Sequence, residues 1–228
     1  LFREYVRLLR GLRPRAFVME NVSGLVKGKM KLVFAEIMRE LKASGYQVKC
    51  RLLNAMYYNV PQSRQRLIWI GLRDDLGKEP SHPKAESRPV TVREAFAFME
   101  HFGGLPPRGA LKEIVPMVRQ GEGANKHHPK GFSFGTHRLM WAKPAPTIIK
   151  TAGATMNLLL HPEIDEGISI AEARRLASFP DEFEQIGDYE TQWMRIGNSV
   201  PPLFMRAVAG HVRGLLACES CEGVGGEA

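Results

Sequence analysis

An acidic and an amide side chain follow an apolar segment near the start of the chain. The run Ala16-Phe17-Val18-Met19 is typical of a buried strand, and Glu20 and Asn21 come directly after it. Sheets of the α/β class bind ligands at the carboxyl ends of their strands, so a carboxylate at this place is suited to contact a substrate. Taken alone, the short motif favours the simpler interpretation that Glu20 caps the following turn.

Two arginines lie at strand spacing in the segment 60–66, which reads VPQSRQR. On a strand, Arg64 and Arg66 would point to the same face. Two guanidinium groups on one face can bind a phosphate, a carboxylate or a base oxygen. Taken alone, however, this spacing favours an edge strand with a solvated basic face.

A third polar segment, Gly197-Asn198-Ser199-Val200-Pro201-Pro202, precedes an apolar helical pattern. Proline is favoured in the first turn of a helix, and backbone N–H groups at a helix start can approach a ligand. The Asn198 amide would lie beside them. An ordinary junction between a loop and a helix is the alternative.

The elements that must position these residues alternate along the first part of the chain. Apolar periodicity predicts helices over 1–12 and 30–41 and strands over 16–19, 46–53 and 67–72. A glycine C-cap is predicted at Gly45. This order indicates a layered α/β sheet, in which the last two strands pair antiparallel at an edge.

Prolines and glycines punctuate residues 78–146, which predicts loops and short strands. A short helix is predicted near 91–99, because Thr91 can cap it and Glu94 stands three residues on. Further helices are predicted over 169–178 and 201–216. The last of these has an apolar stripe, and the tail after Ala217 is expected to be loose.

Composition limits the class of protein. The 228 residues include 32 Lys and Arg against 24 Asp and Glu, a formal charge of +8, which favours a polyanionic partner. Three cysteines, Cys50, Cys218 and Cys221, are too few for a disulfide framework, and the last two make only a weak zinc motif. No apolar run long enough to cross a bilayer and no signal peptide are found.

Four motifs occur together in one order: Glu20-Asn21-Val22, Pro-Gln-x-Arg-x-Arg at 61–66, Ala-Arg-x-Leu-x-x-Phe-Pro-Asp-x-Phe at 173–183, and Gly-Asn-Ser-Val-Pro-Pro at 197–202. The segment 143–148 (KPAPTI) looks like a Pro-x-Thr-[Ile/Leu] motif that belongs with them. Over nearly its whole length the chain therefore resembles the DNA cytosine-5 methyltransferases. Four ordered motifs are much more specific than any one of them.

The resemblance also has departures. The family's Asn-Ala-Ala-Asp-Tyr-Gly-Val-Pro-Gln reads NAMYYNVPQ over 54–62, so Asn59 replaces a glycine and can adopt a left-handed conformation if the position needs one. The family's Phe-x-Gly-x-Gly cofactor loop and Pro-Cys catalytic loop, which precede Glu-Asn-Val, are not found. We therefore expect a truncated or split enzyme, inactive as this chain alone.

The resemblance implies roles for individual residues. Glu20 would protonate or hydrogen-bond N3 of a flipped-out cytosine, and Arg66 would polarise its O2, with Arg64 nearby. Asn198, Ser199 and Val200 would belong to the pocket of the methyl donor, S-adenosylmethionine. The catalytic set is thus Glu20, Arg64 and Arg66, and no metal ligand is predicted.

The implied DNA-binding residues are Gln62, Arg64, Thr147 and Gly153. Thr147 would contact the phosphate beside the flipped nucleotide, and loops before Gly153 would contact base edges. Lys126, His127, His128 and Lys130 are as well explained by a surface loop as by DNA contact.

The expected fold is α/β: an incomplete Rossmann-like methyltransferase domain and a smaller, loop-rich target recognition domain. The boundaries expected are 1–77 for the catalytic part, 78–165 for target recognition, 166–195 for a hinge, 196–217 for a returning helix and 218–228 for the tail. The apolar stripe of 201–216 is expected to pack against the missing half.

The function implied is methyl transfer to C5 of a cytosine in a specific site of double-stranded DNA. The expected partners are DNA and the missing N-terminal half or a complementary subunit, in the cytoplasm of a prokaryote at the nucleoid, without a membrane. Two alternatives stay open. One is a noncatalytic DNA-recognition subunit, and the other is a tRNA cytosine-5 methyltransferase, although the long 78–146 stretch favours DNA.

Overall fold

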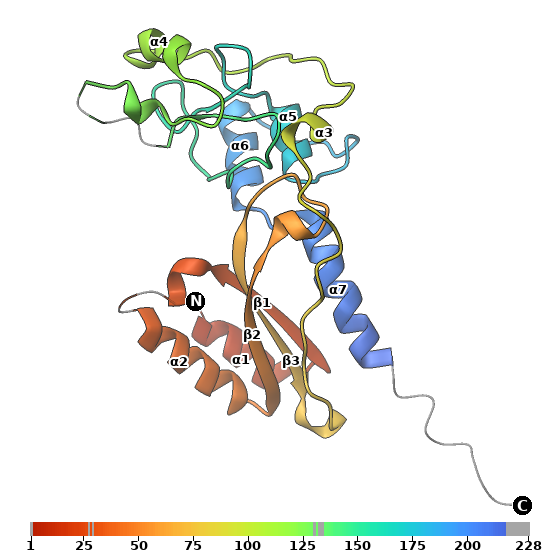
Figure 1. Ribbon diagram of the computed structural model, residues 1–228. Helices are drawn as coiled ribbons and strands as arrows, with labels where there is room; N and C mark the ends of the chain where they lie inside the picture. Colours follow the sequence, from red (N-terminus) through yellow and green to blue (C-terminus); the bar gives the residue numbers. More distant parts are fainter. Residues whose placement is uncertain (1, 27, 29, 130, 132–134, 218–228) are drawn as a thin grey trace, which may run out of the picture. The chain divides into compact units, whose positions relative to one another are not determined.

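The computed structural model describes residues 2–26, 28, 30–129, 131 and 135–217, and it divides into two compact units (Figure 1). Unit 1 contains the described residues of 1–54, 65–84 and 206–228. Unit 2 contains those of 55–64 and 85–205. The predicted tail after Ala217, with Cys218 and Cys221, lies outside the described residues, as does Lys130.

A three-stranded sheet forms the centre of unit 1. Its strands are β1 (Ala16–Val22), β2 (Tyr46–Asn54) and β3 (Gln65–Arg73), in the order β1-β3-β2. Both pairings are antiparallel, as predicted for β2 and β3. As predicted, the β2–β3 pair lies at an edge of the described sheet, with β2 as the outer strand. The edge strand that the arginine spacing alone favoured for 60–66 is wrong, because β3 lies between the other two strands. Its near-continuous apolar run, buried from Leu67 to Leu72, suits a central strand.

Two amphipathic helices pack on this sheet, α1 (Phe2–Leu12) and α2 (Met30–Lys42) (Figure 1). Their apolar faces join strand side chains in one core, with Leu41 and Trp69 fully buried. Gly45, at φ +87°, ends α2 in the left-handed conformation that the sequence predicts there. Asn59, at φ +59°, likewise adopts the conformation expected of the residue that replaces a glycine.

Unit 2 is built from short elements joined by long loops. They are α3 (Val92–Ala95), α4 (Leu111–Ile114), α5 (Ile170–Leu176), α6 (Tyr189–Asn198) and the parallel pair β4 (His137–Arg138) and β5 (Leu159–Leu160). Across both units, the described residues also form five 3-10 helices: η1 (Ser23–Val26), η2 (Ala55–Tyr57), η3 (Asp74–Leu76), η4 (Val115–Met117) and η5 (Ala124–Lys126).

Capping boxes begin two of these helices. Thr91 and Glu94 form the box predicted for α3, but α3 ends at Ala95, well short of the predicted residue 99. Ser169 and Glu172 form a second box at the start of α5. Each box satisfies backbone N–H groups that a helix start leaves without partners. Sequence periodicity did not predict α6.

A buried arginine ties the loops of unit 2 together. The Arg138 side chain is 5% exposed, and its guanidinium donates to the carbonyls of Val115, Val118, His161 and Ile164. It also pairs with Asp165 at 2.5 Å. Satisfied carbonyls of this kind allow a loop-rich unit to hold one conformation with little regular structure.

The last helix, α7 (Pro202–Ala217), continues across the division between the units at Met205. The sequence predicted that its apolar stripe packs against a missing half. Phe204, Ala207 and Val208 are instead buried within this chain, and the Phe204 ring packs on Tyr58 at 5.2 Å. That prediction is wrong for these three residues. Across the described residues, no helix combines the length and the hydropathy needed to cross a bilayer.

Candidate functional site

Glu20 and Arg66 form an ion pair across the β1–β3 pairing. In the antiparallel register Glu20 lies opposite Ile68, and Val22 lies opposite Arg66, so the two charged residues are diagonal neighbours. Glu20 Oε1 is 2.6 Å from Arg66 Nε, and the side chains are 27% and 12% exposed. The structure therefore brings together the two residues for which the family resemblance implies contacts with the cytosine ring.

Arg64 does not share this face. It precedes β3 and belongs to unit 2, where its side chain is buried. Its two Nη atoms donate to the carbonyls of Ile148 and Gly197, each at 2.9 Å. The prediction that Arg64 and Arg66 point to one face is wrong, because the strand begins only at Gln65. In this structure Arg64 thus holds two backbone carbonyls of unit 2.

Gln62 is also buried, and it joins the segment 61–64 to the segment 144–149. Its Oε1 accepts from the Ile148 N–H at 3.1 Å, and a parallel bridge links Gln62 to Ala145. Thr147 Oγ1 donates to the Ser63 carbonyl at 2.7 Å. We call Gln62, Arg64, Thr147, Ile148 and Gly197 the motif junction. Gln62 and Arg64 hold backbone groups there and, in this structure, face no solvent.

Gly197 completes the motif junction through close backbone approach. A Cβ at this position would lie 2.5 Å from the Ile149 carbonyl oxygen and 2.6 Å from Lys150 Cα. Only glycine allows α6 to reach that backbone. The glycine of the Gly-Asn-Ser-Val-Pro-Pro motif therefore serves packing, and it lies inside α6.

The residues after Gly197 differ in how far they are available to a ligand. Asn198 is the last residue of α6, and its side chain is exposed. Ser199 is half-buried, and its hydroxyl donates to the Ile196 carbonyl at 2.7 Å. Val200 is half-buried before the proline pair. The exposed Asn198 amide is thus the group here best placed to contact a ligand.

Gly153, predicted to contact DNA, begins a tight turn. Its N–H donates to the Met156 carbonyl at 3.0 Å, and the Met156 N–H donates back to the Gly153 carbonyl at 3.1 Å. A Cβ at this position would meet only the Met156 oxygen, at 3.8 Å. Packing therefore does not require a glycine here.

Comparison with known proteins identifies the family. The C-5 cytosine-specific DNA methylase family matches residues 1–101 and 93–213. The chain belongs to this family. It is 29% identical to the Type II methyltransferase M.Sau96I of Staphylococcus aureus and 30% identical to M1.HphI of Haemophilus parahaemolyticus, over 88% and 92% of its own length.

The chain spans only 51% and 59% of those two methylases. Among solved structures, Spodoptera frugiperda DNMT2 shares the fold, with a TM-score of 0.67 over 95% of this chain and 71% of that one. The identity in that comparison is 16%, so the likeness concerns the fold. It agrees with the predicted α/β methyltransferase class.

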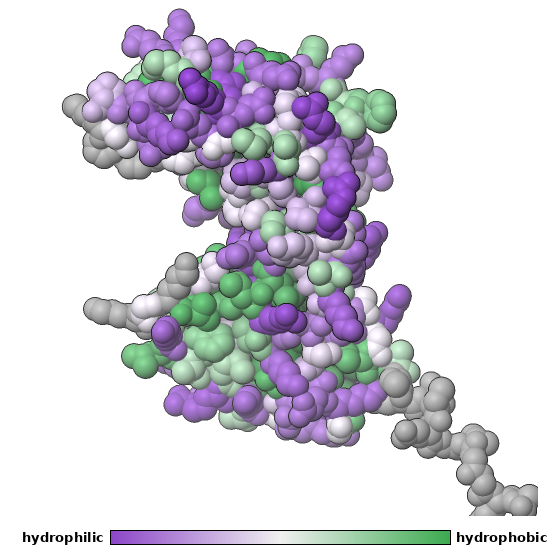
Figure 2. Space-filling view, in the orientation of Figure 1, coloured by the Kyte–Doolittle hydropathy of each residue, from purple (hydrophilic) through white to green (hydrophobic). Residues whose placement is uncertain are grey.

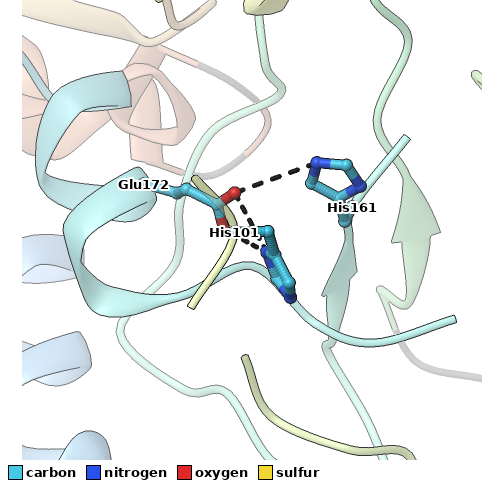
Figure 3. Close-up of side chains that lie close together, drawn as sticks. All are labelled: His101, His161 and Glu172. Carbon is cyan, nitrogen blue, oxygen red and sulfur yellow. Dashed lines mark hydrogen bonds and ion pairs between the residues drawn. The ribbon is translucent and has the colours of Figure 1, made fainter. Parts of the chain in front are cut away.

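Sequence reasoning about this methylase chain missed one cluster of ionisable side chains in unit 2. His101, His161 and Glu172 place their ligating atoms within 4.8 Å of one another, and Figure 3 shows the carboxylate directed toward both rings. His101 Nδ1 is 3.0 Å from both carboxylate oxygens, and His161 Nε2 is 3.9 Å from one. The three residues come from separate segments, so no local spacing signals them.

The hydrogen bonds of this cluster favour a polar network over a metal site. His161 Nδ1 accepts from the N–H groups of Glu163 and Ile164, each at 3.2 Å. A neutral ring that accepts at Nδ1 carries its proton on Nε2, where a metal would need a lone pair. Glu172 also accepts from the Ser169 N–H at 2.7 Å as part of the capping box. The cluster therefore fixes α5 against the loop of His101.

Stability should depend on pH through His161. Burial is the main cause that lowers the pKa of His161 below its ordinary 6.5. The folded state then disfavours the charged ring. The contribution of the neutral His161 ring to folding stability is therefore complete above pH 6.5 and is lost as the pH falls. We expect the urea concentration at the unfolding midpoint to decrease when the pH is lowered from about 8 to about 5.5. The decrease should be smaller in His161→Gln. An equal fall in both proteins would contradict this assignment.

Proposed function

We propose that this chain is the part of a DNA cytosine-5 methyltransferase that binds the target cytosine and the surrounding DNA. The enzyme acts on double-stranded DNA at the nucleoid in the cytoplasm of a prokaryote. The observation that carries the proposal is the Glu20–Arg66 pair between β1 and β3, in a member of the C-5 cytosine-specific DNA methylase family. Glu20 lies within β1, which continues to Val22, and not after the strand as the sequence predicted. A purely recognising subunit has no use for a carboxyl group paired in this way.

The pair suits one edge of a cytosine ring. N3 and O2 are neighbouring positions on that edge, so a carboxyl group and a guanidinium in contact at 2.6 Å can address both at once. In this proposal Glu20 acts in its protonated form, released from its pair with Arg66: it donates its proton to N3 as charge develops there during attack on the ring, and takes it back when the ring is restored. Arg66 stabilises the charge that reaches O2.

The methyl donor implied by the family is S-adenosylmethionine, which supplies the methyl group when bound. The exposed Asn198 amide offers both a donor and an acceptor at the end of α6, and it fits a polar part of that molecule. The Ser199 hydroxyl can still accept a hydrogen bond, although its proton goes to Ile196. We assign Asn198, Ser199 and Val200 to that contact.

We assign DNA recognition to unit 2. In this assignment the motif junction holds the segment after Pro144 in place, and Thr147 and Gly153 approach the duplex from it. A phosphate contact by Thr147 requires its hydroxyl to turn away from the Ser63 carbonyl, to which it donates now. Gln62 and Arg64 support this surface from within rather than touching DNA.

A complementary part, either the N-terminal half or a separate subunit, would bind unit 1. Apolar residues gather on the face of unit 1 drawn in Figure 2. On α1, Leu8 and Leu12 are 47% and 76% exposed. In the described residues β1 pairs only with β3, so its other edge offers backbone groups to a further strand. Both features suit a protein partner that completes the sheet.

The test supplies the protein of the complete gene with S-adenosylmethionine and either duplex DNA or transfer RNA. We expect 5-methylcytosine in DNA, detected by mass spectrometry of the hydrolysed nucleosides. Methylation of the transfer RNA but not of the DNA would show that the substrate is RNA. Sequence-specific DNA binding without methyl transfer, even after a complementary subunit is added, would favour the noncatalytic subunit.

A further inference from the structure

Unit 2 contains a cavity of about 480 Å³ beside Thr147. One wall is apolar and includes Ile149, Leu159 and Trp193. The polar side chains of Asn125 and His137 line it as well. A volume of this order accommodates a group the size of a nucleobase.

The two polar side chains differ from the others that line the cavity. Within the described part of the chain, no hydrogen bond engages the Asn125 amide or the His137 ring, whereas the Thr147 hydroxyl donates to Ser63 and the Asn157 amide donates to Thr151. Asn125 is exposed and His137 half-buried. Both can therefore take a ligand without breaking an internal bond.

Gly123 has no side chain, and this leaves room for the Asn125 amide. A Cβ at Gly123 would lie 2.5 Å from Asn125 Oδ1, so any other residue there would push the amide away. This close approach gives Gly123 a role that turn geometry does not require, because its φ of −90° is open to any residue.

The chemistry of the lining points to a neutral ligand with both donors and acceptors. None of the described lining residues is Lys, Arg, Asp or Glu. Burial lowers the pKa of His137, so its ring is neutral near pH 7, with one donor and one acceptor nitrogen. An amide offers the same combination.

A base edge in the major groove presents such a mixed pattern, and adenine matches an amide in two hydrogen bonds, at N6 and N7. We propose that the major-groove edge of a base pair in the DNA target site docks at this cavity and that Asn125 and His137 determine sequence specificity, with Asn125 selecting adenine. The inference rests on the proposed function, because it needs DNA as the substrate. It adds the residues that discriminate between bases.

The experiment uses the protein of the complete gene and a duplex library with random bases around a cytosine. Bisulfite sequencing records which sites are methylated, and the total of 5-methylcytosine is measured separately. We expect Asn125→Ala to reduce discrimination at one base position by about 5- to 100-fold, and His137→Ala to reduce it at the same or an adjacent position. Asn125→Asp keeps the shape but only accepts hydrogen bonds, so it should shift the preference from adenine toward cytosine.

Lys126→Ala is the matched control, since Lys126 is a neighbour of Asn125 but does not line the cavity and pairs with Glu122 at 3.0 Å. It should change methylation of all sites equally, with unchanged base preference. Thermal unfolding verifies that each variant is folded. Unchanged preference in Asn125→Asp and in His137→Ala, with a wild type that methylates a defined site, would overturn the cavity's role alone. A wild type that methylates no DNA would overturn the proposed function and this inference together.

Discussion

Glu20→Gln should lose methyl transfer by about 100-fold or more while DNA binding persists. Glutamine keeps the size of the side chain and can still accept a hydrogen bond, but it has no acidic proton to deliver to N3. It also replaces the charged partner of Arg66, 2.6 Å away, with a neutral amide. Single-turnover methylation and a mobility-shift assay on the same duplex measure the two properties in the complete protein.

Glu36→Gln provides a matched control for this loss. Glu36 is another glutamate of unit 1 paired with an arginine, Arg3, at 3.3 Å, but it lies on α2 away from β1. Its variant should methylate DNA at the wild-type rate. Full turnover by Glu20→Gln would show that the proton at N3 comes from elsewhere, and loss of DNA binding would show that Glu20 acts in the fold.

Arg64→Met should destabilise the protein by about 2–6 kcal/mol, because it leaves two buried carbonyls unsatisfied and each costs about 1–3 kcal/mol. The variant leaves the carbonyls of Ile148 and Gly197 without the guanidinium that now serves both. Arg64→Lys should recover only part of the loss, since one ammonium lacks the fork that spans two acceptors. Urea unfolding of the complete protein measures the change.

The neighbouring arginine supplies the comparison. Arg66→Met removes a partner of Glu20 that lies at the candidate site, so it should lower methyl transfer much more than it lowers stability. If Arg64→Met were as stable as the wild type but inactive, Arg64 would be a catalytic residue and not a positioning residue. The two variants thus separate the roles of arginines that are two positions apart.

The sequence by itself determined the elements of unit 1 and the family. Helices α1 and α2 and strands β1, β2 and β3 follow from local periodicity, and Gly45 and Asn59 have the left-handed backbone that their residue types predict. Local patterns suffice there because each element buries one face, or two in β3, against its neighbours. The four ordered motifs indicated the methylase family before any contact was known.

Only the tertiary structure decided which motif residues lie at the candidate site and which hold backbone groups in the interior. Arg64 and Arg66 have the same residue type and similar surroundings in the sequence, yet one is enclosed by Ile148 and Gly197 and the other pairs with Glu20. Burial depends on residues that are distant along the chain, so no local pattern carries it. For the same reason, neither the His101–Glu172 contact nor the close backbone approach at Gly197 could be predicted from the sequence.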